Sequence, residues 1–203
     1  MRIAVAQDTE TAGLSTELPP LSRLAVAYAP VGARPAWTAL VLFDHRLSRA
    51  VAGASSPLLA QLKLAWWRDR MREAASRWPQ GDPLLAALEA FDDERVALVA
   101  LVDAWEGLIG EEGEGELGPG ALERLGEARA DAIAALARTL ACAADPGAIA
   151  TLARCWTMPD AQMSAAVRLP RALRPLVILA NAPPSGAGPA AMLRTVRLGM
   201  FGR

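Results

Sequence analysis

Residues 57–78 constrain the fold more than any other stretch, because their apolar side chains recur at the spacing of an α-helix. Steps of three and four residues place side chains on one helix face. Ser56 suits an N-cap and Pro57 suits the first helical position, so both mark a helix start. The pattern predicts a helix over 57–78 whose apolar face is wide enough to be buried. That face comprises Leu64, Trp67, Met71, Ala74 and Trp78, with Leu59, Leu62 and Trp66 in an adjoining stripe.

The rest of the chain also favours helix, because alanine dominates its apolar residues and β-branched residues are sparse. Alanine loses no rotamer freedom in a helix. Gly53 is expected to end the second helix, because glycine tolerates the positive φ of a C-cap. We therefore predict an all-α fold. Its helices are expected over about 20–28, 35–53, 57–78, 84–91, 94–109, 119–140, 146–158, 170–180 and 190–200.

The length and the breaks in the pattern predict a single helical domain. The chain has 203 residues, which is enough for one buried core and only marginally enough for two. Closely spaced glycines and glutamates at 110–116 predict a loop. Short connections between many helices predict an antiparallel bundle. We expect a flexible N-terminus over residues 1–19, the helical domain over 20–181, and a loop with a short basic helix over 182–203.

Composition excludes several classes of function. The 21 basic and 22 acidic residues leave no strong field to attract nucleic acid. Cys142 and Cys155 have neither a Cys-x-x-Cys spacing nor a neighbouring histidine, so they form no zinc or redox motif. Asp8 and Glu10 interrupt the apolar run that a secretory signal needs, and no stretch of about twenty apolar residues follows. We expect a cytoplasmic protein, and a mean hydropathy of +0.21 is compatible with peripheral contact at the inner face of the membrane.

Four segments together resemble one protein family. They are residues 34–43, residues 57–71 with the element Trp66-Trp67-Arg68, residues 101–108, and the late stretch Val167-Arg168-Leu169-Pro170. Their order and spacing are similar to those of the squalene/phytoene synthase family from Leu21 to Leu179. The resemblance implies an isoprenoid-synthase-like antiparallel helical bundle. Active members of that family join two prenyl diphosphates head to head.

The sequence departs from this family at the residues that carry its chemistry. Active members need two Asp-x-x-x-Asp motifs on facing helices, because carboxylates one turn apart chelate the Mg²⁺ that neutralises and helps to expel diphosphate. Asp44 is alone where the first motif is expected, and His45, Arg46 and Arg49 follow it. Asp160 is alone where the second is expected. We therefore expect no metal site, no cofactor, and loss of the reaction. The chain is also shorter than active members, which predicts a truncated bundle.

A ligand pocket is the main candidate site, and we expect no catalytic residue. The candidate lining residues are Phe43, Trp67, Met71, Asp103 and Glu106, with Lys63 and Arg68 as candidate phosphate ligands. Each has a structural alternative. Trp66 and Trp67 suit helix packing, and since adjacent helical residues point about 100° apart, at most one faces a cavity. Asp103 and Glu106 share one helix face and suit a salt bridge, while Lys63, Arg68, Arg70 and Arg72 suit a solvated face. Asp44 and His45 are expected to be structural or on the surface.

Three functional hypotheses remain. The first is a non-catalytic member that acts as a binding or assembly module for an isoprenoid-like ligand or a subunit of a membrane complex, resembling the branch of the mitochondrial respiratory complex I assembly factor. The alternative is an active, Mg²⁺-dependent head-to-head prenyltransferase of isoprenoid biosynthesis. The third is a helical scaffold without a ligand. It is favoured if no cavity lies between the helices that carry Phe43, Trp67 and Asp103.

Overall fold

The computed structural model describes residues 13–109, 120–158 and 167–181, and within these ranges all regular structure is helical. The predicted all-α fold is confirmed. None of the described helices combines the length and the hydropathy needed to cross a bilayer. Residues 13–17 are helical. They are followed by α2 (Pro20–Ala27), α3 (Arg34–Ala52), α4 (Pro57–Arg72), α5 (Pro83–Leu88), α6 (Arg95–Glu106), α7 (Ala121–Thr139), α8 (Pro146–Thr157) and α9 (Arg174–Ala180).

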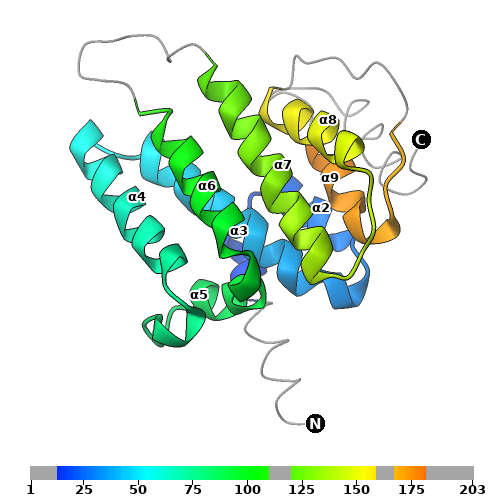
Figure 1. Cartoon of the computed structure of the whole chain (residues 1–203), viewed down its shortest axis with the longest axis horizontal. Coiled ribbons are helices and arrows are strands. Elements are labelled where there is room, and N and C mark those ends of the chain that lie inside the picture. Colours follow the sequence, from blue (N-terminus) through cyan, green and yellow to red (C-terminus); the bar gives the residue numbers. More distant parts are fainter. Residues whose placement is uncertain (1–12, 110–119, 159–166, 182–203) are drawn as a thin grey trace.

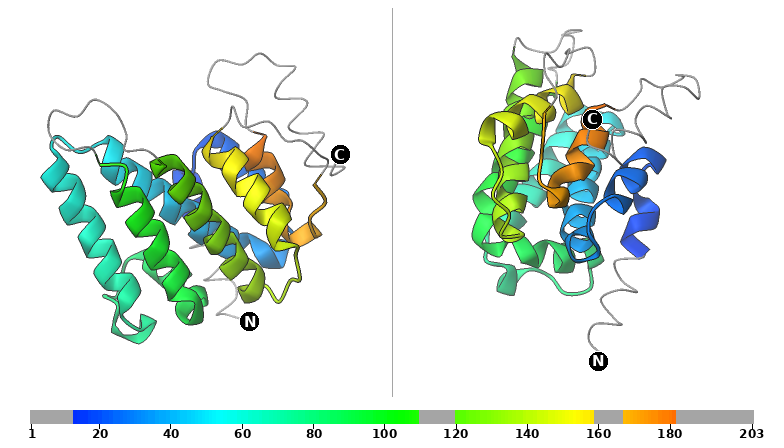
Figure 2. Two further views of the ribbon diagram at one scale, coloured as in Figure 1. Left: turned by 45° about the horizontal axis from the view of Figure 1, so that its top comes forward. Right: turned by 90° about the vertical axis from the view of Figure 1, so that its right-hand side faces the viewer.

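Four of these helices form a row, and α3 runs behind it. Figure 1 shows α4, α6, α7 and α8 side by side in that order, and the turned view in Figure 2 shows the same row. Helix α3 crosses behind this row and contacts α4, α6 and α7, while α9 and α2 complete the second layer. Helix α4 lies at one edge of the row, where its neighbours among the described helices are α6 and α3.

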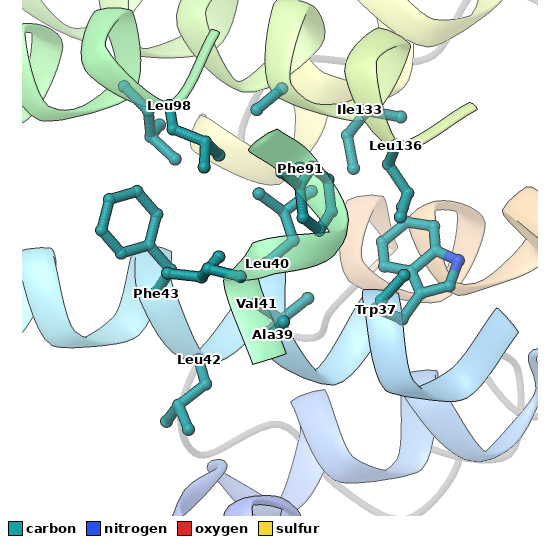
Figure 3. Packing of buried hydrophobic residues seen from close by; sticks show 14 of the residues in the cluster. Trp37, Ala39, Leu40, Val41, Leu42, Phe43, Phe91, Leu98, Ile133 and Leu136 are labelled. Carbon is teal, nitrogen blue, oxygen red and sulfur yellow. The ribbon is translucent and has the colours of Figure 1, made fainter. Parts of the chain in front are cut away.

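Helix α3 is the centre of the core, because it is buried on every side along half its length. All residues from Ala36 to Phe43 are buried, and Trp37, Leu40 and Phe43 are at most 1% exposed. A helix that is apolar all round has to be enclosed by other elements. Figure 3 shows Leu40 beside Phe91, and Trp37 beside Leu136 of α7. The core is therefore assembled around α3.

Capping side chains begin the helices where the sequence predicted. The hydroxyl of Ser56 accepts a hydrogen bond from the backbone N–H of Leu59 at the start of α4. The carboxylates of Asp82 and Asp145 accept backbone N–H bonds at the starts of α5 and α8. In each case a proline occupies the first turn, where its missing N–H has no intrahelical partner to lose.

The helix predicted over 57–78 is wrong at its C-terminal end. Helix α4 stops at Arg72, the backbone turns extended at Glu73, and a short 3₁₀ helix (Ala75–Arg77) follows. Trp78 folds back, and its indole Nε1–H donates to the carbonyl of Arg70 at 2.6 Å. The apolar spacing continues past the break because the turn returns Trp78, 4% exposed, to the same core.

The packed structure also begins earlier than the predicted boundary at residue 20. Leu14 and Leu18 are each 3% exposed and belong to the core, so part of the segment expected to be flexible is packed. The loop expected at 110–116 and the basic helix expected within 182–203 lie outside the described residues.

Gly53 ends α3 as predicted, but for a different reason. Its φ is −99°, so the left-handed conformation that we expected is absent. A Cβ atom at this position would lie 2.9 Å from the carbonyl oxygen of Arg49. Glycine is needed here because the chain passes close to the last turn of its own helix.

We predict that Gly53→Ala lowers the free energy of unfolding by about 1 kcal/mol, because the new methyl group forces the chain away from the Arg49 carbonyl. Urea denaturation followed by circular dichroism measures the change. Gly32→Ala is the matched control, since nothing lies within 4 Å of its Cβ position and its effect should stay within about 0.5 kcal/mol. Equal stabilities for the two variants would contradict this explanation.

Candidate functional site

A buried ion pair joins α3 to α7 inside the bundle. The guanidinium of Arg129 donates from Nη2 to Oδ2 of Asp44 at 2.8 Å and from Nε to Oδ1 at 3.1 Å. Asp44 is 5% exposed and Arg129 is 8% exposed. Two parallel hydrogen bonds of this kind are the strongest arrangement between an arginine and a carboxylate.

Aromatic and hydroxyl groups complete the surroundings of this pair. The indole Nε1–H of Trp105 in α6 donates to Oδ1 of Asp44 at 2.9 Å. The Arg129 guanidinium lies 4.3 Å from the ring centroid of Trp156 and 5.3 Å from that of Trp105, within reach of cation–π attraction. It also donates from Nη1 to the hydroxyl of Thr157 at 3.2 Å. Asp44 thus connects three helices, and Arg129 reaches a fourth.

The groups that surround the Asp44 carboxylate do not fit a magnesium site. Mg²⁺ requires near-octahedral oxygen ligands. Both oxygens of this carboxylate already accept hydrogen bonds from Arg129, and one also accepts from Trp105. Across residues 13–109, 120–158 and 167–181, no three side chains of His, Cys, Asp or Glu converge as a metal site would require. Asp160, expected near the second motif, lies outside these ranges.

A second group of charges lies between α4 and α6. Arg68 donates from Nε to Oδ1 of Asp103 at 2.6 Å, and its Nη2 donates to Oε2 of Glu106. Partial burial alone would lower the pKa of Arg68, but the hydrogen bonds and charges of the two carboxylates raise it. Asp103 and Glu106 do share one helix face, as predicted, and both carboxylates are occupied by a cation of the protein itself.

A groove of about 870 Å³ lies between α3 and α4. Basic side chains of α3 and α4 line it together with apolar and aromatic ones. At its edge, Arg46 forms ion pairs with two carboxylates. Its Nη2 lies 3.1 Å from Oε2 of Glu17, and its Nη1 lies 3.4 Å from Oδ2 of Asp82. The groove-lining residues considered below are His45, Arg49, Lys63, Leu62, Trp66 and Trp67.

His45 reports the electrostatic character of this groove. Partial burial lowers its pKa, the positive charge of Arg49 lowers it further, and the negative charge of Asp44 opposes both. The net direction is downward, so the imidazole is neutral at neutral pH. The positive charge of the groove therefore comes from its arginines and Lys63.

The structure separates the predicted pocket residues into three places. Phe43 and Met71 have no exposed surface and belong to the core. Trp67, 7% exposed, packs edge-on against Phe43 at 5.2 Å between ring centroids and also borders the groove with Lys63. Arg68 is bound to Asp103 and Glu106. These seven residues do not line a common cavity, and whether any binds a ligand stays a prediction.

Sequence reasoning missed Arg129, although the sequence carries a signal for it. Arg129 stands between Leu125 and Ile133, four residues from each, on the apolar face of the helix. Asp44 similarly ends an unbroken apolar run in α3. A charge in a buried position needs an opposite charge, so these two out-of-place residues could have been paired.

We predict that Arg129→Met lowers the free energy of unfolding by about 3–5 kcal/mol, because it leaves the Asp44 carboxylate buried without its partner. The double variant Asp44→Leu with Arg129→Met should recover part of that loss, which a double-mutant cycle in urea measures. Arg138→Met is the control, since the Arg138 side chain is 59% exposed and its pair with Glu94 is worth less than about 1 kcal/mol. Additive effects of the two core substitutions would show that the pair is not coupled.

We predict that His45 in the folded protein titrates below its ordinary pKa of about 6.5. Because the folded pKa is lower than the unfolded one, the unfolded chain binds protons more tightly. Stability should therefore fall as the pH drops through the unfolded pKa towards the folded one, and this effect should be absent above that window. His45 is the single histidine of the chain, so one imidazole resonance in a proton NMR titration reports it. Arg49→Gln should raise the pKa, and a wild-type value at or above 6.5 would refute the prediction.

Comparison with known families gives one match, which covers most of α2 and continues past the end of α6. Residues 22–109 match the sequence model described as squalene/phytoene synthase, a range that includes Asp44, Arg68 and Trp105 but stops before Arg129. The resemblance at Val167-Arg168-Leu169-Pro170 and that to the assembly-factor branch stay predictions. Neither the curated proteins nor the solved structures gave a significant match. Over residues 22–109, which are fewer than half of its 203 residues, the chain is similar to the squalene/phytoene synthase family.

Proposed function

We propose that this protein has lost prenyl transfer and uses the family's helical bundle as a binding or assembly module. The observation that carries the proposal is the bidentate contact of Arg129 with Asp44. Asp44 is the carboxylate found where the resemblance predicts the first magnesium motif. Its negative charge is balanced by a cation of the protein.

Exchanging Arg129 for a metal ion would be costly. Releasing Asp44 would leave the guanidinium 8% exposed against two indole rings, without its anion. Breaking a buried pair from one side costs about 3–5 kcal/mol, because the remaining charge stays desolvated. A single carboxylate would have to offset that cost with few additional oxygen ligands. The described part of the bundle is thus suited to holding Asp44 in an ion pair.

The second group of carboxylates supports the same proposal. Asp103 and Glu106 both bind Arg68, so a cation already lies between them. Asp103 is half exposed, which makes this group weaker evidence than the buried pair, since exposed ion pairs are readily exchanged with solvent ions.

The groove between α3 and α4 favours a binding module over a scaffold without a ligand. A volume of about 870 Å³ is in the range of small-molecule sites. It lies between the helices that carry Phe43 and Trp67, whereas Asp103 on α6 does not line it. An isoprenoid-like ligand or a subunit of a membrane complex remains the class of partner that we propose.

The purified chain incubated with farnesyl or geranylgeranyl diphosphate and Mg²⁺ should release no pyrophosphate above a protein-free blank. An active member of the squalene/phytoene synthase family, run in parallel, shows that the assay works. The melting temperature should also be unchanged by Mg²⁺, because ligand binding to the folded state would raise it. Sustained pyrophosphate release together with a head-to-head product would establish the enzymatic alternative.

A further inference from the structure

Helix α4 carries a second apolar face that the described structure leaves exposed. Leu58, Leu62 and Trp66 are four residues apart and so follow one line along the helix, and Leu59 lies beside them. The exposed fractions are 63% for Leu58, 44% for Leu59, 57% for Leu62 and 43% for Trp66. We call these four residues the α4 outer stripe. The buried face of the same helix, with Leu64 and Met71, already fixes α4 to the bundle.

Basic side chains border the stripe on the side of the groove. Lys63 of α4 is exposed beside Leu62 and Trp66, and Arg49 of α3 is exposed across the groove. No ion pair is formed by either side chain within the described ranges, in contrast to Arg46 and Arg68. Asp69 is the exposed acid beyond Trp66, so cations prevail near the centre of the stripe.

We infer that the α4 outer stripe, with Lys63 and Arg49, docks on the surface of an anionic lipid bilayer. Leucine side chains would enter the acyl boundary, and the indole of Trp66 suits the level of the head groups. Lys63 and Arg49 would meet lipid phosphates there. A single small ligand held in the groove would cover Leu62 and Trp66, both of which line it, but not Leu58 and Leu59, which do not.

The position of α4 in the fold fits such a surface. Figures 1 and 2 show α4 at the edge of the row formed with α6, α7 and α8. Among the described helices it contacts α6 and α3, so its outer side is open to a flat partner. The inference concerns a different face from the Asp44–Arg129 pair and is independent of whether prenyl transfer is lost.

Co-sedimentation of the full chain with lipid vesicles tests the inference. Vesicles of phosphatidylcholine with phosphatidylglycerol should retain the chain, vesicles of phosphatidylcholine alone should retain much less, and added salt should weaken retention. Lys63→Gln should lower the partition coefficient about fivefold. Leu62→Gln should lower it by at least about fivefold, since it removes an apolar side chain that is 57% exposed before binding.

Matched variants on other elements serve as controls. Val31→Gln removes an exposed apolar side chain away from the stripe, and Arg154→Gln removes an exposed cation on α8. Both should bind vesicles like the wild type. All positions are exposed, so circular dichroism should show unchanged helix content in every variant.

Three results would overturn the inference. The first is a failure of anionic vesicles to retain the wild-type chain. The second is an equal loss in the α4 variants and the controls, which would point to a surface elsewhere. The third is binding of monomeric short-chain phosphatidylglycerol with no retention on vesicles, which would identify a site for single amphiphiles.

Discussion

The contact between Asp44 and Arg129 is the constraint on which the rest of the structure depends. It joins α3, the centre of the core, to α7, which lies in the other layer. A buried ion pair stabilises little by itself, but it penalises every arrangement that separates its members. Helix α7 can therefore not rotate or slide without exposing both charges to apolar surroundings. The same position of α7 keeps the contacts of Trp105 and Trp156, because the first indole donates to Asp44 and the second lies against Arg129.

The carboxylates that the sequence analysis considered for metal or ligand binding share one feature among the described residues. Arginines of the protein neutralise them. Asp44 is bound by Arg129, and Asp103 with Glu106 is bound by Arg68. A fixed guanidinium provides charge and orientation, but it cannot offer open coordination positions to a diphosphate as a metal does. The groove of about 870 Å³ between α3 and α4 is lined by none of these three acids.

Much of the fold could be predicted from the sequence, because helix formation here depends on local signals. Ser56 and Pro57 marked the start of α4, and that cap is present; aspartate caps also begin α5 and α8. The end of α4 could not be predicted, since Trp78 keeps helical spacing while reaching the core through a turn. Gly53 was correctly predicted to end α3, but the reason given was wrong. Its φ is not left-handed, and glycine is needed because a Cβ atom would lie too close to the Arg49 carbonyl oxygen.

The site was harder to predict than the fold, because it depends on contacts between residues far apart in the chain. Helical spacing predicted that Asp103 and Glu106 lie on one helix face. It could not show which of several arginines binds both of them. Phe43 and Met71 were expected at a pocket and are core residues, since an apolar periodic pattern does not distinguish a cavity wall from a packed interior. Predicting the role of Arg129 would have required pairing it with Asp44, the other charged residue in an apolar stretch of sequence.

The most direct test of the central claim is a crystal structure of the chain grown with Mn²⁺, a scatterer that substitutes for Mg²⁺, and a prenyl diphosphate. The account predicts Arg129 within hydrogen-bond distance of both oxygens of Asp44, and no anomalous density peak at that carboxylate. An anomalous peak bound to Asp44, with the Arg129 side chain displaced, would contradict it.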